Sequence, residues 1–580
     1  MTNYDYAVIV FYFIFMLGMG WLVSRFVKTT SDYFRGGGQM VWWLVGASAF
    51  MTQFSAWTFT GAASKAYSEG WPIFVIFFSN ALGFLWNAAY FAPRSRQMRL
   101  VTALEAVRER FSRGNEQLYT WLQIPLGTLY AGIWLNGLCV FLTAAFGFDL
   151  ELTIMVTGAV VVLMTLVGGS WAAIAGDFIQ ALILLPVTVV AALLALHKVG
   201  GPVAFVEKLP PGHLDLAAIF DSPLMMLWIV AIIIKQFIST NNLFEASRYL
   251  CVKDGRHARR AALLAGILFF VGPVVWFITP MAARIVYPDL HAVFPNLRNP
   301  EEGAFFAICM ATMPAGMLGL LVSGMLSATM SSMDSGLNKN AGIFIKNFYQ
   351  PILRPQATDA HLVFAGKIAT AVLGALVILA GLNFSRLEGI GLFDLMLRFG
   401  TLVAVPYTVP LVLCVLYRRT PPWSGWTTVL VCMAASYLTT AFLTPAWLER
   451  TLSLAPLTPA AAGYWIIAAG LFMNVGVGCA WFFGTSLFWS GTPATDRARI
   501  EGFFDRMLRP VDFAKEEGPG SDRQQGDVLG KLCLCYGAFV CLLALIPNPL
   551  PGRLAFLGCG GVVVSIGWLL IRTSRRPAAG

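Results

Sequence analysis

Hydroxyl-bearing residues gather in one apolar run in the second half of the chain. The stretch 323–340 contains Ser331, Ser332 and Ser335. If this run is helical, Ser331 and Ser335 lie one turn apart and present their hydroxyls on one face. Neutral hydroxyl and carbonyl oxygens suit a monovalent cation such as sodium, whereas a cage of carboxylates favours a divalent ion. The alternative is that each hydroxyl bonds back to its own helix.

A second stretch, residues 46–64, is also dense in small and hydroxyl-bearing residues. Small residues let helices approach closely, so one interpretation is helix packing. The other is a broken helix whose unwound main-chain carbonyl oxygens line a polar cavity. The sequence of this stretch leaves both interpretations open.

Asp177 is an acidic residue within a third apolar run, residues 171–196. A carboxylate inside a membrane helix is costly, so its default interpretation is functional and it needs a partner. The candidate partners are a sodium ion and the hydroxyl of Ser332 or Ser335. The alternative is a structural partner, such as a backbone donor or a lysine.

The composition identifies the surroundings of these residues as lipid. Of the 580 residues, 57% are hydrophobic and 12% are charged, against about 25% charged in an ordinary soluble protein. The formal net charge of +10 comes from Lys and Arg in short loops between apolar runs, which is typical of cytoplasmic loops and not of a nucleic-acid-binding surface. The ten Cys are scattered without the spacing of a zinc site or a disulfide framework.

The hydropathy pattern predicts an all-α membrane protein. We expect about fifteen spans, each long enough to cross a hydrocarbon core of roughly 30 Å. Their approximate limits are 4–27, 42–66, 70–92, 118–147, 151–168, 171–196, 224–248, 258–285, 303–337, 362–383, 389–417, 425–444, 464–487, 530–547 and 553–572. The spans 151–168 and 171–196 are joined by very little chain, which predicts a tight turn.

The loop charges predict the orientation of the chain in a cell membrane. Alternate loops are rich in Lys and Arg, and these are expected in the cytoplasm. With the N-terminus outside and the C-terminus inside, the inner loops carry Arg25, Lys28, Arg35, Arg94, Arg96, Arg99, Lys253, Arg256, Arg259, Arg260, Arg418, Arg419, Arg575 and Arg576. We therefore predict a multi-pass protein of the plasma membrane in this orientation.

Several motifs occur in order over roughly residues 5–420. Together they resemble the sodium/solute symporter family, which includes the sodium/glucose and sodium/proline cotransporters. The resemblance is carried by Gly37-Gly38-Gln39-Met40-Val41-Trp42-Trp43, Pro93-Arg94, the stretch from Gly168-Gly169 to Asp177 and Gln180, Arg248-Tyr249-Leu250 with Lys253-Asp254, and the stretch from Ala328 to Asn338.

The resemblance implies a core of five plus five helices in an inverted repeat, the LeuT fold, with binding sites near the middle of the membrane. The two repeats would cover 42–196 and 224–417. The rest of the chain would add an N-terminal helix, two further helices, a cytoplasmic segment and a C-terminal helix pair, at 4–27, 425–487, 488–529 and 530–572.

The resemblance also implies a sodium site, with sodium as the only metal ion. Its ligands would be the main-chain carbonyl oxygens of Met51, Phe54 and Ala328 and the hydroxyls of Ser331 and Ser332. A second sodium position, found in some members, would use Asp177, Ser332 and Ser335.

The candidate solute site departs from the sugar-transporting members. Gln53 and Asn242 match positions that face the solute in relatives, and Trp57 is a candidate wall of the site. Those relatives carry an acidic residue on the helix matching 70–92, where this chain has Asn80. They carry Gln after a Phe-Asp pair, where this chain has Arg398.

Two intramembrane cations have more than one interpretation. Arg398 either clamps a solute carboxylate or pairs with Asp394, four residues earlier on the same helix face. Lys235 either snorkels to the membrane surface or pairs with Glu245.

The expected function is therefore sodium-coupled symport of a small polar solute. The solute would be a sugar, a sugar derivative, an organic acid or an amino acid, and the protein would work as a monomer by alternating access. The alternative is a transporter-like membrane sensor that signals through a partner docked on 488–529. An enzyme is not expected, because the sequence has no zinc motif, phosphate loop or nucleophile elbow.

Overall fold

The computed structural model describes a helical protein. Its described residues are 1–24, 38–100, 102–215, 222–295, 297–387, 391–516 and 522–575, and within them the side chains of residues 21, 23, 24, 164, 167–173, 334 and 335 are not described. In these ranges β-sheet pairing is confined to one isolated bridge between Met40 and Val252. The prediction of an all-α membrane protein is confirmed.

Twelve helical segments among the described residues are long and apolar enough to cross a membrane. Three predicted spans, 42–66, 151–168 and 303–337, are not among these segments, and the count of about fifteen is not confirmed. Residues 42–66 are divided between two short helices, and 303–337 are divided between α16 (Ala304–Thr312) and α17 (Met317–Ile343). Of residues 151–168, the stretch up to Leu163 is apolar and helical, and the side chains of residues 164, 167 and 168 are not described.

The span at 42–66 is broken, as one of the two sequence interpretations predicted. Helix α3 (Trp42–Thr52) ends at a C-cap, Gln53, and a single 3₁₀ turn at Ala56–Thr58 leads into α4 (Gly61–Ser68). Ser55 between them has extended backbone. Main-chain carbonyl groups at the break are therefore released from helical hydrogen bonding and are available to line a cavity.

The first helix of the second predicted repeat is broken as well. Helix α12 (Pro223–Asn241) ends where Asn242 becomes extended, and a single turn of helix, α13 (Ala246–Tyr249), follows. The Asn242 side chain donates to the carbonyls of Ile238 and Ser239, at 3.1 and 2.8 Å, and accepts from the N–H of Phe244 at 3.0 Å. Interrupted helices at matching positions of the two halves are typical of an inverted repeat.

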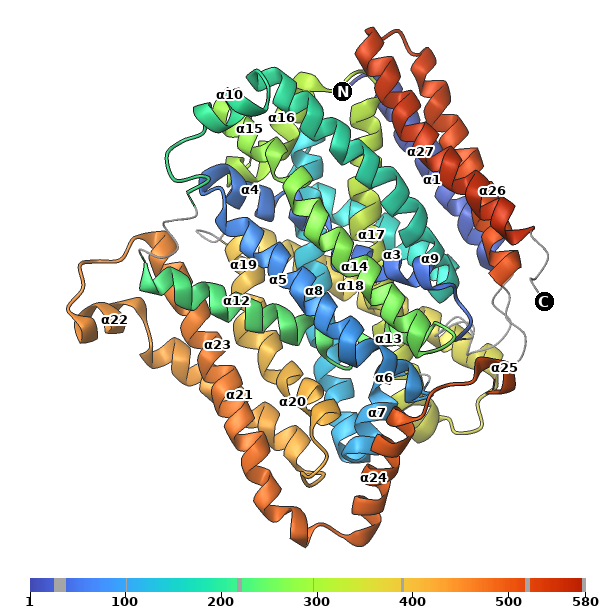
Figure 1. Ribbon diagram of the computed structural model, residues 1–580, viewed down its shortest axis with the longest axis vertical. Coiled ribbons are helices and arrows are strands. Elements are labelled where there is room, and N and C mark those ends of the chain that lie inside the picture. The colour runs from blue at the N-terminus through green and yellow to red at the C-terminus, as the bar shows by residue number, and fades with distance from the viewer. Residues whose placement is uncertain are drawn as a thin grey trace.

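The remaining core helices surround these two. In the first half they are α5 (Pro72–Trp86), α6 (Ala92–Gln97), α7 (Ala103–Arg110), α8 (Arg113–Phe146) and α9 (Leu150–Val199). In the second half, besides α16 and α17, they are α14 (Gly255–Trp276), α15 (Ile278–Val286), α18 (Asp359–Ser385), α19 (Leu392–Phe399) and α20 (Val405–Leu416). Figure 1 shows α3, α9, α14 and α17 meeting near the centre of the molecule.

Helix α9 differs from the prediction. The structure assigns one helical element of 50 residues over both predicted spans 151–168 and 171–196, and no separate loop at the expected tight turn. At 1.5 Å per residue this corresponds to about 75 Å of helix, more than twice the thickness of a hydrocarbon core. Its two halves pack on different partners: Gly158 lies against Ile378 of α18, and Leu184 lies against Gly324 of α17.

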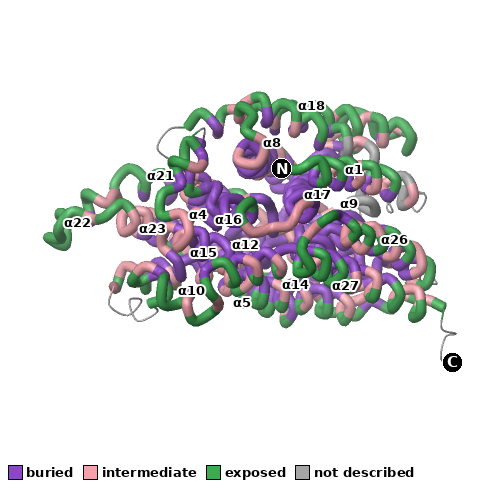
Figure 2. The backbone as a smooth tube through the Cα atoms, turned by 90° about the horizontal axis from the view of Figure 1, so that it is seen from above, coloured by how far each residue is buried: buried purple, intermediate pink, exposed green. Residues whose placement is uncertain are grey.

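The outer surface of the helix bundle is apolar, as lipid contact requires. Figure 2 shows buried backbone at the centre and exposed backbone on peripheral helices such as α18 and α26 (Asp522–Leu542). One stripe of α18 exposes large apolar side chains at helical spacing, namely Phe364, Ile368, Val372, Leu376 and Leu379. A soluble protein rarely exposes such a continuous apolar stripe, so this face of α18 fits a lipid environment.

Helices α26 and α27 (Leu550–Ser574) form a hairpin beside α1 (Asn3–Ser24), as seen on one side of Figure 1. Phe11 of α1 stacks on Phe539 of α26. The turn of the hairpin is fastened to the start of α17, because the Asn548 side chain exchanges hydrogen bonds with the main chain of Ala315. The other end of α26 lies near the loop before α14, where Asp522 pairs with Lys253 at 2.7 Å.

The described parts of the segment 488–529, which are 488–516 and 522–529, pack on the chain's own loops. It includes α24 (Ala494–Leu508) and α25 (Phe513–Glu516). Arg99, which follows α6, donates to the Glu516 carboxylate at 2.7 and 2.8 Å and to the Pro510 carbonyl at 2.9 Å. Arg506 pairs with Glu109 of α7. This segment therefore closely covers the loops that the sequence analysis placed in the cytoplasm.

The buried carboxylate of Asp5 caps α17 from another helix. One oxygen accepts from the N–H groups of Gly316 and Gly319, both at 2.9 Å. Asp5→Ala leaves these two buried donors without a partner, so we expect a loss of about 2–4 kcal/mol in the free energy of unfolding. Asp149→Ala, which removes the exposed cap of α9, is the control and should cost about 1 kcal/mol. Thermal unfolding of the purified variants measures both, and equal losses would contradict this account.

Candidate functional site

A central cavity of about 300 Å³ is lined by residues of both predicted repeats. One end of the cavity is lined by the break after α3, at Thr52 and Gln53. The other end is lined by Thr102 and Cys251, which lie beside the basic loops. Its remaining walls are aromatic and amide side chains together with a few charged groups, including Trp57, Asn80, Tyr130, Trp134, Lys235, Gln236, Asn242, Glu245, Arg248, Lys339 and Tyr407. A mostly apolar cavity with a few convergent polar groups is the usual form of a small-molecule site.

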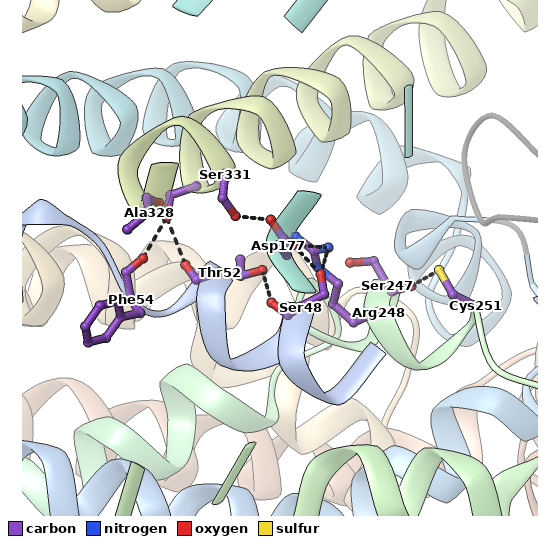
Figure 3. Close-up of polar contacts among 10 residues, drawn as sticks. Ser48, Thr52, Phe54, Asp177, Ser247, Arg248, Cys251, Ala328 and Ser331 are labelled. Atoms are coloured by element: carbon purple, nitrogen blue, oxygen red, sulfur yellow. Dashed lines mark hydrogen bonds and ion pairs between the residues drawn. The ribbon is translucent and has the colours of Figure 1, made fainter. Parts of the chain in front are cut away.

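Oxygen atoms from the break after α3 converge on Ser332 of α17. The Ser332 hydroxyl lies 3.2 Å from the carbonyl oxygen of Phe54, 3.4 Å from that of Thr52 and 3.2 Å from that of Ala328 in its own helix. Figure 3 shows the carbonyls of Phe54 and Thr52 directed toward α17 at this point. These four oxygens, together called the Ser332 cluster, come from neutral groups on two different elements.

The break is held in place by a second contact with α17. The Thr329 hydroxyl accepts from the N–H of Ala56 at 3.0 Å, and both groups are buried. Thr329 and Ser332 are one turn apart, so one face of α17 contacts both ends of the break. The Ser332 cluster also lies at the C-terminal end of α3, where the helix dipole favours a positive charge.

Asp177 of α9 organises a neighbouring set of contacts. Its carboxylate is completely buried and accepts from the hydroxyls of Ser331 and Ser48. It also pairs with the guanidinium of Arg248 at 3.5 Å, and the same guanidinium contacts the Ser48 hydroxyl. Figure 3 shows these side chains joining α3, α9, α13 and α17. Asp177 and its partners Ser48, Arg248 and Ser331 therefore connect the two broken helices, at α3 and α13, to the long helices α9 and α17.

The structure brings together some of the predicted sodium ligands and not others. The Phe54 and Ala328 carbonyls meet the Ser332 hydroxyl. The Ser331 hydroxyl turns to Asp177 instead, and the Met51 carbonyl accepts from the N–H of Phe54 at 3.1 Å. The side chain of Ser335, the remaining predicted ligand, lies outside the described residues.

The predicted solute residues also separate into two groups. Gln53, Trp57, Asn80 and Asn242 all line the central cavity, but the amide of Asn242 is already used to cap the break after α12. The indole N–H of Trp57 donates to the carbonyl of Leu392 at 3.2 Å. Among the described residues, Arg398 does not line the cavity, and its guanidinium is not within salt-bridge distance of the Asp394 carboxylate.

Sequence reasoning missed several residues of the site. Thr52 contributes a carbonyl to the Ser332 cluster, and Ser48 and Arg248 contact Asp177. A signal for Arg248 existed, because a buried carboxylate requires a cation and Arg248 belongs to a motif already noted. No sequence signal distinguishes Thr52 from Met51, because any residue type can supply a main-chain carbonyl.

Glu302 fastens the start of α19 from a turn outside the membrane spans. Its carboxylate accepts from the N–H of Leu392 at 2.7 Å, the residue whose carbonyl accepts from Trp57. Burial raises the pKa of Glu302 to about 7, although the hydrogen bonds from Leu392 and Asn299 act in the opposite direction. Because the ordinary pKa is 4.5, Glu302 stays protonated to a higher pH in the folded protein than in the unfolded chain.

This raised pKa gives a pH dependence with a defined sign. Between about pH 4.5 and 7 the folded state binds more protons at Glu302 than the unfolded state, so stability falls as the pH rises through this window. The total change is at most about 3 kcal/mol. We expect Glu302→Gln, which keeps an acceptor for Leu392, to flatten this part of the melting-temperature profile. Parallel profiles for the two proteins from pH 5 to 8 would contradict the assignment.

Comparisons with known proteins agree with this architecture. Sodium/glucose cotransporter 4 of Danio rerio is 27% identical over 461 residues, covering 72% of this chain and 68% of that protein. Sodium/myo-inositol cotransporter 2 of Oryctolagus cuniculus is 27% identical over 409 residues, covering 64% of this chain and 60% of that protein.

Two solved structures share the fold at low sequence identity. A Na⁺-coupled sialic acid symporter, in a substrate-bound outward-open state, aligns with a TM-score of 0.65 at 21% identity, covering 83% of this chain and 98% of that one. MHP1, a nucleobase-cation-symport-1 family transporter, aligns with a TM-score of 0.54 at 16% identity, covering 82% and 99%. The core is therefore of the LeuT type. A family model described as the sodium:solute symporter family matches residues 33–422, and the chain therefore belongs to that family.

Proposed function

We propose that this protein is a sodium-coupled symporter that moves a small polar organic solute by alternating access. The observation that carries the proposal is the Ser332 cluster, in which carbonyl oxygens of a broken helix meet a hydroxyl of α17. Membership of the family and the names of the relatives support sodium as the coupling ion.

The chemistry of the Ser332 cluster fits sodium. Its oxygens are neutral and hard, and the C-terminal end of α3 adds a partial negative charge. Phe54, Ala328, Ser332 and Thr52 would hold the ion, whereas Met51 and Ser331 have other partners in this conformation. At the second predicted sodium position, the Arg248 guanidinium would compete with a sodium ion, because it already pairs with the Asp177 carboxylate.

The same cluster offers a route for coupling. A sodium ion held there would join the break after α3 to α17, so its affinity would depend on how the two elements sit relative to one another. An ion drives a conformational change only through such differential affinity. Gln53 is adjacent to Thr52 and faces the cavity, so sodium binding would also order one wall of the solute site.

The proposed orientation places the basic loops in the cytoplasm and the N-terminus outside a plasma membrane. Asp5 and the α26–α27 turn both contact the start of α17, whereas the far end of α26 contacts Lys253 in a basic loop. The N-terminal end of α1 thus lies on the face opposite to that basic loop. The central cavity, lined at one end by Thr102 and Cys251, would open to the cytoplasm. The single chain contains both repeats, which supports function as a monomer.

A membrane sensor is the second candidate, and one observation weighs against it. The segment 488–529 would have to dock a signalling partner, but Arg99 and Glu109 already engage its helices. Uptake by proteoliposomes separates the two functions. A symporter accumulates solute when sodium outside exceeds sodium inside, and stops when choline replaces external sodium. A sensor binds solute in both salts without accumulating it, which would overturn the proposal.

A further inference from the structure

Lys235 of α12 carries a cation into the central cavity. Its ammonium has one hydrogen bond among the described residues, a long one of 3.4 Å to the side-chain oxygen of Gln236. No carboxylate of the described residues lies within salt-bridge distance of it. A charge at this depth in a membrane protein is costly unless it has a partner or a role.

The other charged groups that line the cavity are paired. Glu245, which the sequence analysis offered as a partner of Lys235, instead faces Lys339 at 4.0 Å. Arg248 pairs with Asp177 at 3.5 Å. These two pairs cancel, so the described lining of the cavity carries one uncompensated positive charge, at Lys235.

The backbone of Gly400 packs closely beside the Lys235 ammonium. A Cβ at this position would come within 3.3 Å of the ammonium nitrogen and 3.4 Å of the Tyr130 hydroxyl. Gly400 begins a π-helical segment, Gly400–Ala404, between α19 and α20. Such irregular turns are frequent at functional sites, and any larger residue at this one would crowd the ammonium.

An unsatisfied acceptor lines the same cavity. The side-chain carbonyl oxygen of Asn80 is buried and has no hydrogen-bond partner within the described part of the chain. A buried acceptor without a partner costs about 1–3 kcal/mol. The oxygen is covered in this conformation, so a hydroxyl or N–H group of a solute would satisfy it after the Asn80 side chain turns into the cavity.

We infer that the solute is an anion whose carboxylate pairs with Lys235 and whose hydroxyl or amide group donates to Asn80. This inference rests on the proposed function and narrows its solute class to hydroxy or amido organic acids. A neutral sugar would leave the ammonium without a counter-charge, whereas a carboxylate forms a charge-assisted hydrogen bond with it. Lys235, and not Arg398, supplies the positive charge, because Arg398 does not line the cavity.

Pairs of solutes that differ only in charge test this assignment. The probes are gluconate with glucitol, glucuronate with glucose, and lactate with lactamide, added to the purified full-length protein in sodium chloride or choline chloride. Thermal shifts give apparent affinities. We expect the acid of at least one pair to bind at least about tenfold more tightly than its neutral counterpart. Lys235→Met should abolish this preference and Lys235→Arg should retain it, while Lys346→Gln, which removes a cation outside the cavity, serves as the control.

The outcomes separate this inference from the proposed function. Stabilisation by neutral solutes that matches or exceeds that by the acids, or a preference for acids that survives in Lys235→Met, would overturn the role of Lys235 even if sodium is required. A preference for acids that depends on Lys235 but is the same in both salts would support the charge assignment and contradict sodium coupling.

Discussion

Replacing Ser332 with alanine is expected to raise the sodium concentration for half-maximal uptake at least about tenfold. The hydroxyl is the only side-chain group of the Ser332 cluster, and a hydrogen-bonding group that contacts a charge contributes about 1.5–3 kcal/mol. The carbonyl oxygens of Phe54, Thr52 and Ala328 remain in the variant, so binding is weakened and not abolished. Solute uptake into proteoliposomes at varied external sodium gives this concentration directly.

Ser327 provides the matched control for this change. It lies on the same helix, is equally buried, and its hydroxyl bonds to the carbonyl of Ser323 at 2.6 Å within α17. Ser327→Ala should leave the sodium dependence of uptake unchanged. If Ser332→Ala also leaves it unchanged, or if both variants shift it equally, the hydroxyl of Ser332 has no special part in ion binding.

Breaking the Asp177–Arg248 pair is the second change with a large expected effect. Arg248→Met leaves a fully buried carboxylate with two hydroxyl donors among the described residues, and removal of one member of a buried pair costs about 3–5 kcal/mol. The double variant Asp177→Asn/Arg248→Met should lose less stability than the sum of the two single variants. Melting temperatures of the three proteins measure this coupling, and additive losses would show that the pair contributes no interaction energy.

The single variant Arg248→Met also tests whether a sodium ion reaches Asp177. Without the guanidinium, a small cation can compensate the carboxylate, so the stability lost in Arg248→Met should be smaller in sodium chloride than in choline chloride. Asp177→Asn removes the charge and should erase the difference between the two salts. Equal losses in both salts for Arg248→Met would contradict a second sodium position.

The sequence predicted the parts of this site that depend on local composition. Residues 46–64 are small and hydroxyl-bearing, and the break that this composition allowed is present between α3 and α4. The serines at 331 and 332 lie on the helix that faces the break. Both features follow from what a single segment buries, so one sequence suffices to predict them.

The pairing of charged residues that are far apart in the sequence could not be predicted from local composition. Glu245 faces Lys339 and not Lys235, and Asp177 faces an arginine 71 positions away. Which of these groups meet depends on how the long helices are placed relative to one another, and that placement is set by packing across both repeats. For the same reason the position of Arg398 outside the cavity was not apparent from its place in the sequence.

Equilibrium binding of ²²Na⁺ to the purified protein, without any solute, measures whether the Ser332 cluster holds sodium. We expect saturable binding that choline does not displace, that is weakened at least about tenfold in Ser332→Ala, and that is unchanged in Ser327→Ala. Absence of saturable binding in the unaltered protein, or binding of equal affinity in Ser332→Ala, would contradict a sodium site between the break after α3 and α17.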